Sequence, residues 1–464
     1  MQRNYERAPR PLRPRRLAVA LFAALAVTPL AYAQQGQDDA AATRARLAQL
    51  EQMMQAMQSE IAALKAEQTA QAQTQTAATA ASAAQGASAA AKPSIQSAPI
   101  VPKGSPNTTF SYGGFIRAEA LYTRTSDGEI AENSLGRRQY VPASIPIGGN
   151  GEGTDFNTTA QHTRFWFTVD NTNENGDKVK GHIEMDFGTD VNGNQLSTNS
   201  YTPRLRHAYV GWNNWLAGQT WSNFQDVSVL PEAGPLLGPT EGTVFVRQVQ
   251  LRYSKGPWVF TAENPETLLS PYQGVGARIS SDDNNFPDLT ARYTAKGKNA
   301  HFSVAGILRQ LRYQTSDHST DEIGYGLSAS GKVKLGERDE IGGMLTVGRG
   351  IGRYLGYSLN PDGVLDAQGD IESLDILAGF FGWKHNFTPK LRSNLYVSVA
   401  SYDNDTDLTG LTINRSSRSA HANLVYSPFP NLDIGSELLW GMRRIETGES
   451  GELYRLHSFV KYSF

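Results

Sequence analysis

The chain has 464 residues, contains no cysteine and carries a formal net charge of −2 at pH 7. A chain of this length can hold two or three soluble domains or one large barrel, so length alone does not decide the class. The slightly acidic balance excludes nucleic acid as an expected partner. The lack of cysteine is typical of proteins that cross an oxidising periplasm unfolded.

Residues 1–33 have the pattern of a secretory signal peptide. Six arginines precede an apolar run from Leu17 to Val27, and the small residues Ala31 and Ala33 mark a cleavage site. A membrane-anchor helix would need roughly 18 or more apolar residues, and this run is shorter. We expect cleavage after Ala33, which removes six arginines and one glutamate and leaves a net charge of about −7.

Residues 40–68 are predicted to form a periplasmic α-helical coiled coil. Apolar residues from Leu47 to Leu64 alternate three and four residues apart, as heptad a and d positions do, which favours self-association into a homo-oligomer. Only about three heptads are present, so a single amphipathic helix packed on another part of the chain is the alternative. Residues 69–107, rich in Ala, Gln, Ser and Thr with scattered Pro, predict a disordered polar tether.

A change of pattern predicts a transmembrane β-barrel over residues 108–464. No stretch of the mature chain is apolar enough to cross a bilayer as a helix, and closed sheets of strands are the other structure that satisfies its backbone in lipid. In residues 178–187, apolar residues alternate with Lys, His, Glu and Asp, which gives a lipid-facing and a water-facing side. A soluble sandwich strand also alternates, but repeated one-sided runs favour the barrel.

We expect about sixteen antiparallel strands, so that the fold is all-β apart from the coiled coil. The runs are 110–124, 160–171, 177–188, 203–213, 214–221, 243–254, 257–263, 289–295, 299–314, 322–335, 339–351, 372–386, 390–402, 415–427, 431–444 and 452–464. Short turns, such as the one containing Asn175-Gly176, alternate with long polar connections. Outer-membrane barrels have this asymmetry, and an even strand number places both chain ends in the periplasm.

Aromatic residues near the expected strand ends predict girdles at the two membrane interfaces. They include Trp212, Trp215, Trp221, Trp258, Trp383 and Tyr462. The last run places Tyr454, Leu456, Val460, Tyr462 and Phe464 on one face. Ending on an aromatic residue in this arrangement resembles the assembly signal of outer-membrane proteins.

Arginines on the expected water-facing side are the candidate pore-lining and anion-binding residues, because a barrel of about sixteen strands is too wide for its side chains to fill. By strand parity they are Arg117, Arg164, Arg252, Arg292, Arg309, Arg392, Arg443 and Arg455, with Arg206 of ambiguous parity. Guanidinium groups stay charged and match carboxylates through paired donors, so we expect a preference for anions. The alternative is that lumen acids such as Glu184 and Glu437 pair with the arginines and leave weak selectivity.

The connection 222–242 is the expected constriction loop. It contains three prolines and follows the fifth strand, where general porins place theirs, which is an analogy of fold. Its candidate site residues are Asp226, Pro231 and Glu232.

The sequence predicts neither an enzyme nor a resident cofactor or metal. Its histidines lack metal-ligand spacing, and no Gly-x-Ser-x-Gly elbow is present. The glycine-rich segment 348–352 is not followed by a helical pattern, as a phosphate loop would be. Three alternate aspartates from Asp403 begin like a calcium loop, but Leu408 stands where its turn glycine should be.

Segments of the chain resemble the DcaP-like family of trimeric outer-membrane porins. The resemblance is carried by Gly114-Phe115-Ile116-Arg117, Thr163-Arg164-Phe165-Trp166-Phe167, Gly181 to Phe187, Leu205-Arg206-His207-Ala208-Tyr209-Val210-Gly211, Gly218 to Ser222 and Arg247 to Tyr253, whereas the C-terminal half matches only in pattern. It implies a homotrimer in outer-membrane lipid that takes up small organic anions, particularly dicarboxylates and aromatic acids. Of the family's binding residues it matches Arg117, Arg164, Arg206 and Arg252.

Together these patterns predict an outer-membrane porin for passive uptake of small hydrophilic solutes. An outer-membrane anchor or adhesin, whose loops bind an external partner, is the alternative. Ion conduction in a bilayer separates the two.

Overall fold

The computed structural model describes residues 107–151, 153–188, 195 and 198–464. The chain divides into two units, Met1–Ala90 and Ala91–Phe464, and the fold below belongs to the second unit. The expected signal peptide and coiled coil, and all but Asn107 of the expected tether, lie outside the described residues.

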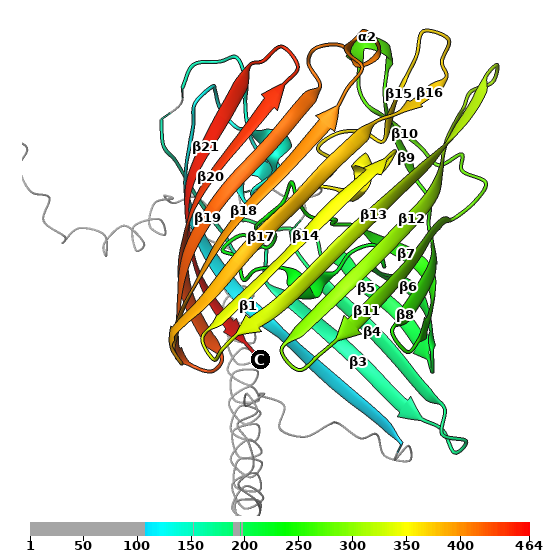
Figure 1. The fold of residues 1–464 in the computed structure, drawn as a ribbon. Helices are drawn as coiled ribbons and strands as arrows, with labels where there is room; N and C mark the ends of the chain where they lie inside the picture. Colours follow the sequence, from blue (N-terminus) through cyan, green and yellow to red (C-terminus); the bar gives the residue numbers. More distant parts are fainter. Residues whose placement is uncertain (1–106, 152, 189–194, 196–197) are drawn as a thin grey trace, which may run out of the picture. The chain divides into compact units, whose positions relative to one another are not determined.

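A closed antiparallel barrel forms the second unit (Figure 1). Its strands are β1 (Thr108–Thr125), β2 (Asp155–Thr159), β3 (Arg164–Thr172), β4 (Lys178–Asp186), β5 (Arg204–Trp212), β6 (Trp215–Trp221), β7 (Arg247–Lys255), β8 (Trp258–Glu263), β11 (Asp288–Lys296), β12 (Ala300–Gln314), β13 (Ser319–Leu335), β14 (Asp339–Arg349), β17 (Asp375–Thr388), β18 (Leu391–Asp403), β19 (Asn414–Phe429), β20 (Leu432–Ile445) and β21 (Ser450–Ser463). Both β2 and β3 pair with β1, one beyond the other, and therefore form one interrupted strand. β21 pairs with β1 and closes the ring. Over the described residues the barrel thus has sixteen strands, which confirms the predicted count.

The predicted run 160–171 is wrong at its start, because the pairing begins in the unpredicted β2 and is interrupted before β3. Residues 160–163 leave the sheet, and the buried His162 binds the carboxylate of Glu119 through its Nδ1. A buried carboxylate is costly without a partner, and His162 supplies one of the partners of Glu119 at the point where the chain leaves the sheet. The alternation of residues within one strand cannot predict this break, because the break depends on Glu119, a residue of another strand.

Apolar side chains cover the outer wall and polar ones the inner side, as the alternation predicted. On β4, Val179 and Ile183 are 38% and 37% exposed, whereas Asp186 is fully buried inside. Four of the five expected girdle tryptophans, together with Tyr462, are also exposed. Trp221 is the exception, because β6 ends there and the chain turns into the lumen, so its ring faces inward.

Two long connections form a small sheet that the sequence analysis did not predict. It comprises β10 (Ile279–Ser281), β9 (Thr267–Ser270), β15 (Gly363–Leu365) and β16 (Ile371–Ser373), in that order. β9 and β15, from different connections, pair in parallel. Pairing between distant short segments leaves no local sequence pattern, so only the tertiary structure reveals it.

The helices of the described part are single turns in connections. They are η1 (Leu135–Arg137), η2 (Pro142–Ser144), η3 (Val227–Val229), η4 (Tyr272–Gly274), η5 (Gly352–Tyr354) and α2 (Thr406–Thr409). None of these helices is long and apolar enough to cross a membrane.

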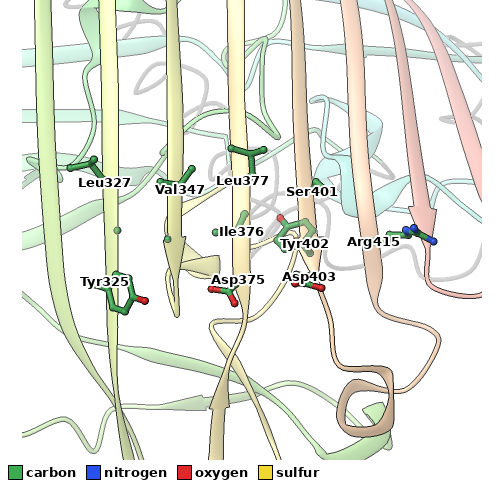
Figure 2. A pocket seen from close by; sticks show the side chains of 12 residues that line it. Tyr325, Leu327, Val347, Asp375, Ile376, Leu377, Ser401, Tyr402, Asp403 and Arg415 are labelled. Atoms are coloured by element: carbon green, nitrogen blue, oxygen red, sulfur yellow. The ribbon is translucent and has the colours of Figure 1, made fainter.

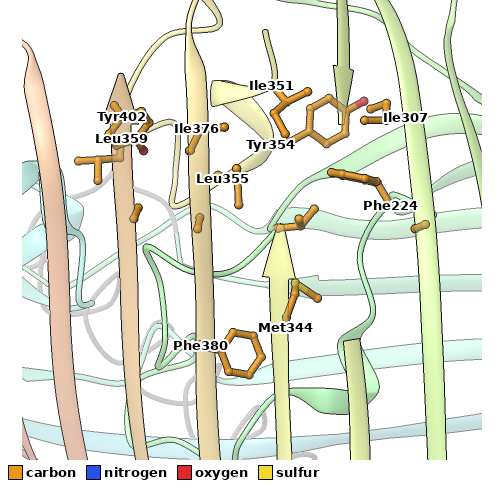
Figure 3. Close-up of a cluster of buried hydrophobic side chains, with 14 of the residues drawn as sticks. Phe224, Ile307, Met344, Ile351, Tyr354, Leu355, Leu359, Ile376, Phe380 and Tyr402 are labelled. Atoms are coloured by element: carbon orange, nitrogen blue, oxygen red, sulfur yellow. The ribbon is translucent and has the colours of Figure 1, made fainter. Parts of the chain in front are cut away.

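An apolar cluster fills one side of the barrel interior (Figure 3). Phe224 and Val244 come from the connection between β6 and β7, and Tyr354 and Leu355 from the one between β14 and β17. They pack against inward side chains of the wall, including Ile307, Met344, Ile376, Phe380 and Tyr402. Burial of this apolar area holds both connections inside the barrel.

Candidate functional site

The connection between β6 and β7 is attached to strands on several sides of the lumen. Arg117 of β1 donates a hydrogen bond to the carbonyl of Gly234. The backbone N–H of Gly234 donates to the carboxylate of Glu437 on β20 at 2.7 Å. Gly242 N–H donates to Ser398 Oγ of β18 at 2.9 Å. Because β18 and β20 lie across the ring from β6 and β7, which carry the connection, the connection crosses the interior.

Glu232 links the same connection to two further side chains. Arg392 Nε donates to its Oε2 at 2.7 Å, and Lys384 Nζ lies 3.3 Å from that oxygen. Burial raises the pKa of the Glu232 carboxyl, but the hydrogen bond and charge of Arg392, with Lys384 and Lys461, outweigh burial and hold the pKa below its ordinary value. Glu232 is therefore a charged anchor of the connection and not an acid that faces the bore alone.

Asp226 anchors the start of η3. Its Oδ2 accepts from Ser330 of β13 at 2.9 Å and lies 3.1 Å from Nε2 of His301 on β12. Burial raises the pKa of Asp226, and hydrogen bonds from Ser228, Ser330 and His301 lower it further than burial raises it. Pro231, the third predicted residue here, lies between η3 and Glu232.

A cavity of about 350 Å³ lies between this connection and the wall formed by β1 and β3 to β6. Its cationic lining residues are Arg117, Arg164, Arg204, Arg206 and Lys461. The one acidic lining residue is Glu184, and aromatic walls come from Phe115, Trp221, Phe245 and Tyr357. Positive charge therefore exceeds negative charge around this space.

Two carboxylates hold the arginines in place. Glu184 accepts from Arg206 at 2.6 Å, and Asp186 accepts from Arg206 and Arg204, both at 2.9 Å. Arg164 is held more loosely, 3.4 Å from Glu184. Two acids thus support three arginines, so the predicted pairing with lumen acids is present but incomplete.

Arg247 adds a further cation near the cavity. Its guanidinium carbon lies 3.9 Å above the ring of Trp221. Among the described residues, its buried Nε and Nη2 atoms have no hydrogen-bond partner. A buried cation with unused donors can bind an anionic ligand.

Comparison with known proteins identifies the family. The model of the DcaP outer membrane protein family matches residues 37–464. The chain belongs to this family. The recognition made from sequence motifs is thereby confirmed, and the chain is an outer-membrane porin of the DcaP family.

A solved DcaP channel has a similar fold. The outer membrane channel DcaP of Acinetobacter baumannii shares 25% sequence identity, with 79% of this chain and 100% of that chain covered and a TM-score of 0.66. A loop-deletion mutant of OmpT from Vibrio cholerae (11% identity, 77% and 100% covered, TM-score 0.48) and an anion-selective porin from Comamonas acidovorans (10% identity, 77% and 100% covered, TM-score 0.48) are more distant. No curated protein matched.

The remaining predicted arginines of this DcaP porin lie inside the barrel in different surroundings. Arg252 donates to the carbonyl of Trp221 at 2.7 Å, and Arg292 donates to that of Gln225 at 2.6 Å. The first contact lies at the end of β6 and the second on the connection that follows, so these side chains support the start of that connection. Their role toward a solute stays a prediction.

Arg309 does not match a solute-facing position, and the half-buried Arg443 is engaged by a connection. Arg309 is 1% exposed, and its guanidinium binds Asp362 at 2.8 Å and lies 3.5 Å from Asp288. Arg443 donates to the carbonyls of Ala143 and Ile145 at 2.6 and 3.1 Å. Both point inward as strand parity predicted, but long connections fold over them, and parity carries no information about what covers a strand.

Sequence reasoning did not nominate Arg204, Arg247 and Lys461. Arg204 shares the face of Arg206 at a spacing of two residues, a signal that was available. Lys461 lies between Val460 and Tyr462, which share the outer face of the last strand, so its inward direction was also available as a signal. Arg247 has ambiguous parity because it begins β7, and its role depends on the inward ring of Trp221.

A different hollow of about 690 Å³ lies mainly on the outer wall (Figure 2). Exposed side chains of Tyr325, Leu327, Val347 and Leu377 surround it, and glycines of β13 and β14 deepen it. These outward residues belong to the lipid-facing side of the strands, so this hollow is not a candidate for the solute path. Within the described residues, no group of three or more His, Cys, Asp and Glu side chains is arranged to hold a metal.

Proposed function

We propose that this porin is a passive, anion-preferring channel for small organic anions, with dicarboxylates and aromatic acids as the favoured solutes. The observation that carries the proposal is the cavity with five cationic lining residues and one acidic one. Charged side chains that line a narrow part of a pore favour ions of opposite sign.

The geometry of the cations supports carboxylates as ligands. A guanidinium offers paired, coplanar donors that match the two oxygens of a carboxylate. Arg164 has only long contacts to its acids, so it can contact a solute without breaking a strong internal ion pair. The rings of Trp221 and Phe245 offer an apolar surface to an aromatic acid.

The deciding experiment is a planar-bilayer recording under a salt gradient, with and without added succinate. We expect a reversal potential on the anion-selective side and concentration-dependent block by succinate. In the double variant R164Q/R204Q, succinate block weakens about tenfold, which corresponds to roughly 1.4 kcal/mol of lost binding. The control R124Q/R415Q removes two exposed arginines outside the cavity and keeps the wild-type block.

Two results would count against the proposal. A cation-selective wild-type channel that succinate does not block overturns the anion preference and leaves the porin assignment intact. Equal loss of block in R164Q/R204Q and in R124Q/R415Q shows that the cavity does not bind the anion.

We also propose that the porin is a homotrimer whose N-terminal segment lies in the periplasm. The heptad pattern and the family resemblance support self-association. The small residues Ala118 and Ala120 on β1 can let two barrel walls approach closely, and Ala118 is exposed on the outer wall.

A further inference from the structure

A second cationic cavity lies at the end of the barrel where the strands are joined by short turns. It has a volume of about 830 Å³ and is bounded by η3 and by the turns around Gly256, Lys298 and the β13–β14 hairpin. In Figure 1 this end also carries the C-terminus. By the rule that short turns face the periplasm, the cavity opens toward the periplasm.

The charges around this cavity are unbalanced. The cations are Arg292, Lys296, Lys298, Lys332 and Lys334, and the acids are Asp226 and Glu340. Both acids are engaged by the protein: Asp226 by Ser330 and His301, as described above, and Glu340 by Lys332 at 3.1 Å. Among the described residues, no ion pair is recorded for Lys296, Lys298 or Lys334, which leaves three lysine charges directed at one space.

The two cationic cavities adjoin the same short segment. Val227 of η3 lines both the arginine cavity and the lysine cavity. The contacts of Asp226 with β12 and β13 hold this segment, and Arg292 holds the carbonyl of Gln225 just before it. A solute that leaves the arginine cavity past η3 therefore meets the lysines next.

We propose that Lys296, Lys298 and Lys334 form a second anion site at the periplasmic outlet, which takes small polyvalent carboxylates from the arginine cavity. This proposal rests on the anion preference proposed above and adds a second site to it. Lysine ammonium groups are flexible, strongly hydrated point charges, so the outlet selects by charge and not by shape. A weak second site speeds release, because conduction requires binding sites that a solute can also leave.

Block measured separately from each side of the bilayer tests the outlet. The chain has no cysteine, so a biotin can be attached to S316C in the exposed turn between β12 and β13, at the end opposite the short turns. Streptavidin reaches this biotin only from that side and thereby reports the orientation of each channel. In K296Q/K298Q/K334Q we expect block by succinate added from the short-turn side to weaken about fivefold, and block from the long-loop side to change less than about twofold. We expect block by citrate to weaken more than block by succinate in this variant, and block by acetate to change very little, because the outlet binds anions according to their charge.

A charge-matched control distinguishes binding at these three lysines from the general electrostatic potential at that end of the barrel. K178Q/K255Q/K390Q removes three lysines at the same end that do not line the cavity, and we expect wild-type block from both sides. If both triple variants lose block equally, or if K296Q/K298Q/K334Q keeps wild-type block from the short-turn side, the outlet site is refuted. If the wild-type channel shows no succinate block from either side, it is the anion preference itself that fails.

A chemical measurement is independent of conduction and of folding defects in the triple variant. Asn299 lies in the cavity beside the lysines, and N299C keeps all of the charges. We expect an anionic thiosulfonate to modify this cysteine about tenfold faster than a cationic one of the same size, with no such ratio at S316C. Equal rates at N299C would overturn the proposal.

Discussion

At Glu232, one carboxylate anchors the connection that crosses the lumen. Its partners Arg392 and Lys384 lie on β18 and β17, so this single side chain bridges the connection to two neighbouring strands. Pro231 and Glu232 were predicted as constriction residues from proline content and analogy alone. The structure adds that Glu232 is engaged by cations, which makes the arginines around the cavity, and not this acid, the charges available to a solute.

The substitution E232Q tests this anchor through its dependence on pH. Since the folded-state pKa of Glu232 lies below its ordinary value, the carboxylate stabilises the fold at neutral pH, and this contribution is lost as the pH falls through the folded-state pKa. We expect E232Q to lower the free energy of unfolding in urea by about 1–3 kcal/mol at pH 7, with the difference shrinking toward zero in strong acid. The exposed Glu337 provides the control E337Q, and a loss for E232Q that does not vary with pH would contradict the role of charge.

At the scale of elements, Arg309 holds two long connections in place, the one between β8 and β11 and the one between β14 and β17. Its guanidinium binds Asp362 and the carbonyl of Gly350 in one connection, and the carbonyl of Glu266 in the other. These connections carry the small sheet in which β9 pairs with β15. The parity of β12 predicted that Arg309 points inward, but its neighbours come from segments that strand patterns do not place.

Removing this ion pair should free the small sheet. We expect R309Q to leave the buried carboxylate of Asp362 without a cationic partner, whereas Asp288 keeps Arg353 at 3.1 Å, and the cost is about 3–5 kcal/mol. Limited trypsin digestion should then cut after the exposed Arg278 at least tenfold faster, because the carbonyls of Ser358 and Leu359 hold its side chain and local opening releases it for the protease. R124Q, on the outer wall, should leave the rate unchanged, and equal digestion of R309Q and wild type would show that Arg309 does not hold these connections.

At the scale of the whole molecule, the ring closes where β1 meets β21. Gly114 and Phe464 exchange two backbone hydrogen bonds of 3.0 Å, and the register continues to Thr125 opposite Leu453. A closed ring has no free sheet edge, as a barrel in lipid requires. The outer wall of β1 is then available only to lipid or to another copy of the barrel.

The proposed trimer makes a prediction about this wall. In detergent, light scattering or native mass spectrometry should give a mass of three mature chains. A118W places a bulky ring in the proposed contact and should shift the mass toward one chain, whereas A329W, on the outer face of β13, should not. A wild-type mass of one chain would refute the trimer.

By itself, the sequence determined the membrane-spanning architecture. Alternation of apolar and polar residues has the period of a strand, and short turns alternate with long connections, so sixteen strands and their inward faces followed from local chemistry. The family followed from short motifs such as the one that contains Arg117. These properties depend on residues that are close together in the sequence, within one strand or one turn.

Only the tertiary structure decided which inward arginines face open space. Arg117, Arg164 and Arg206 come together around one cavity because β1, β3 and β5 are close in the ring, whereas Arg309 also points inward but lies beneath folded connections. The apolar cluster around Phe224 and Tyr354 and the pairing of β9 with β15 place those connections. Such contacts join residues far apart in the chain, and burial energy, not local periodicity, selects them.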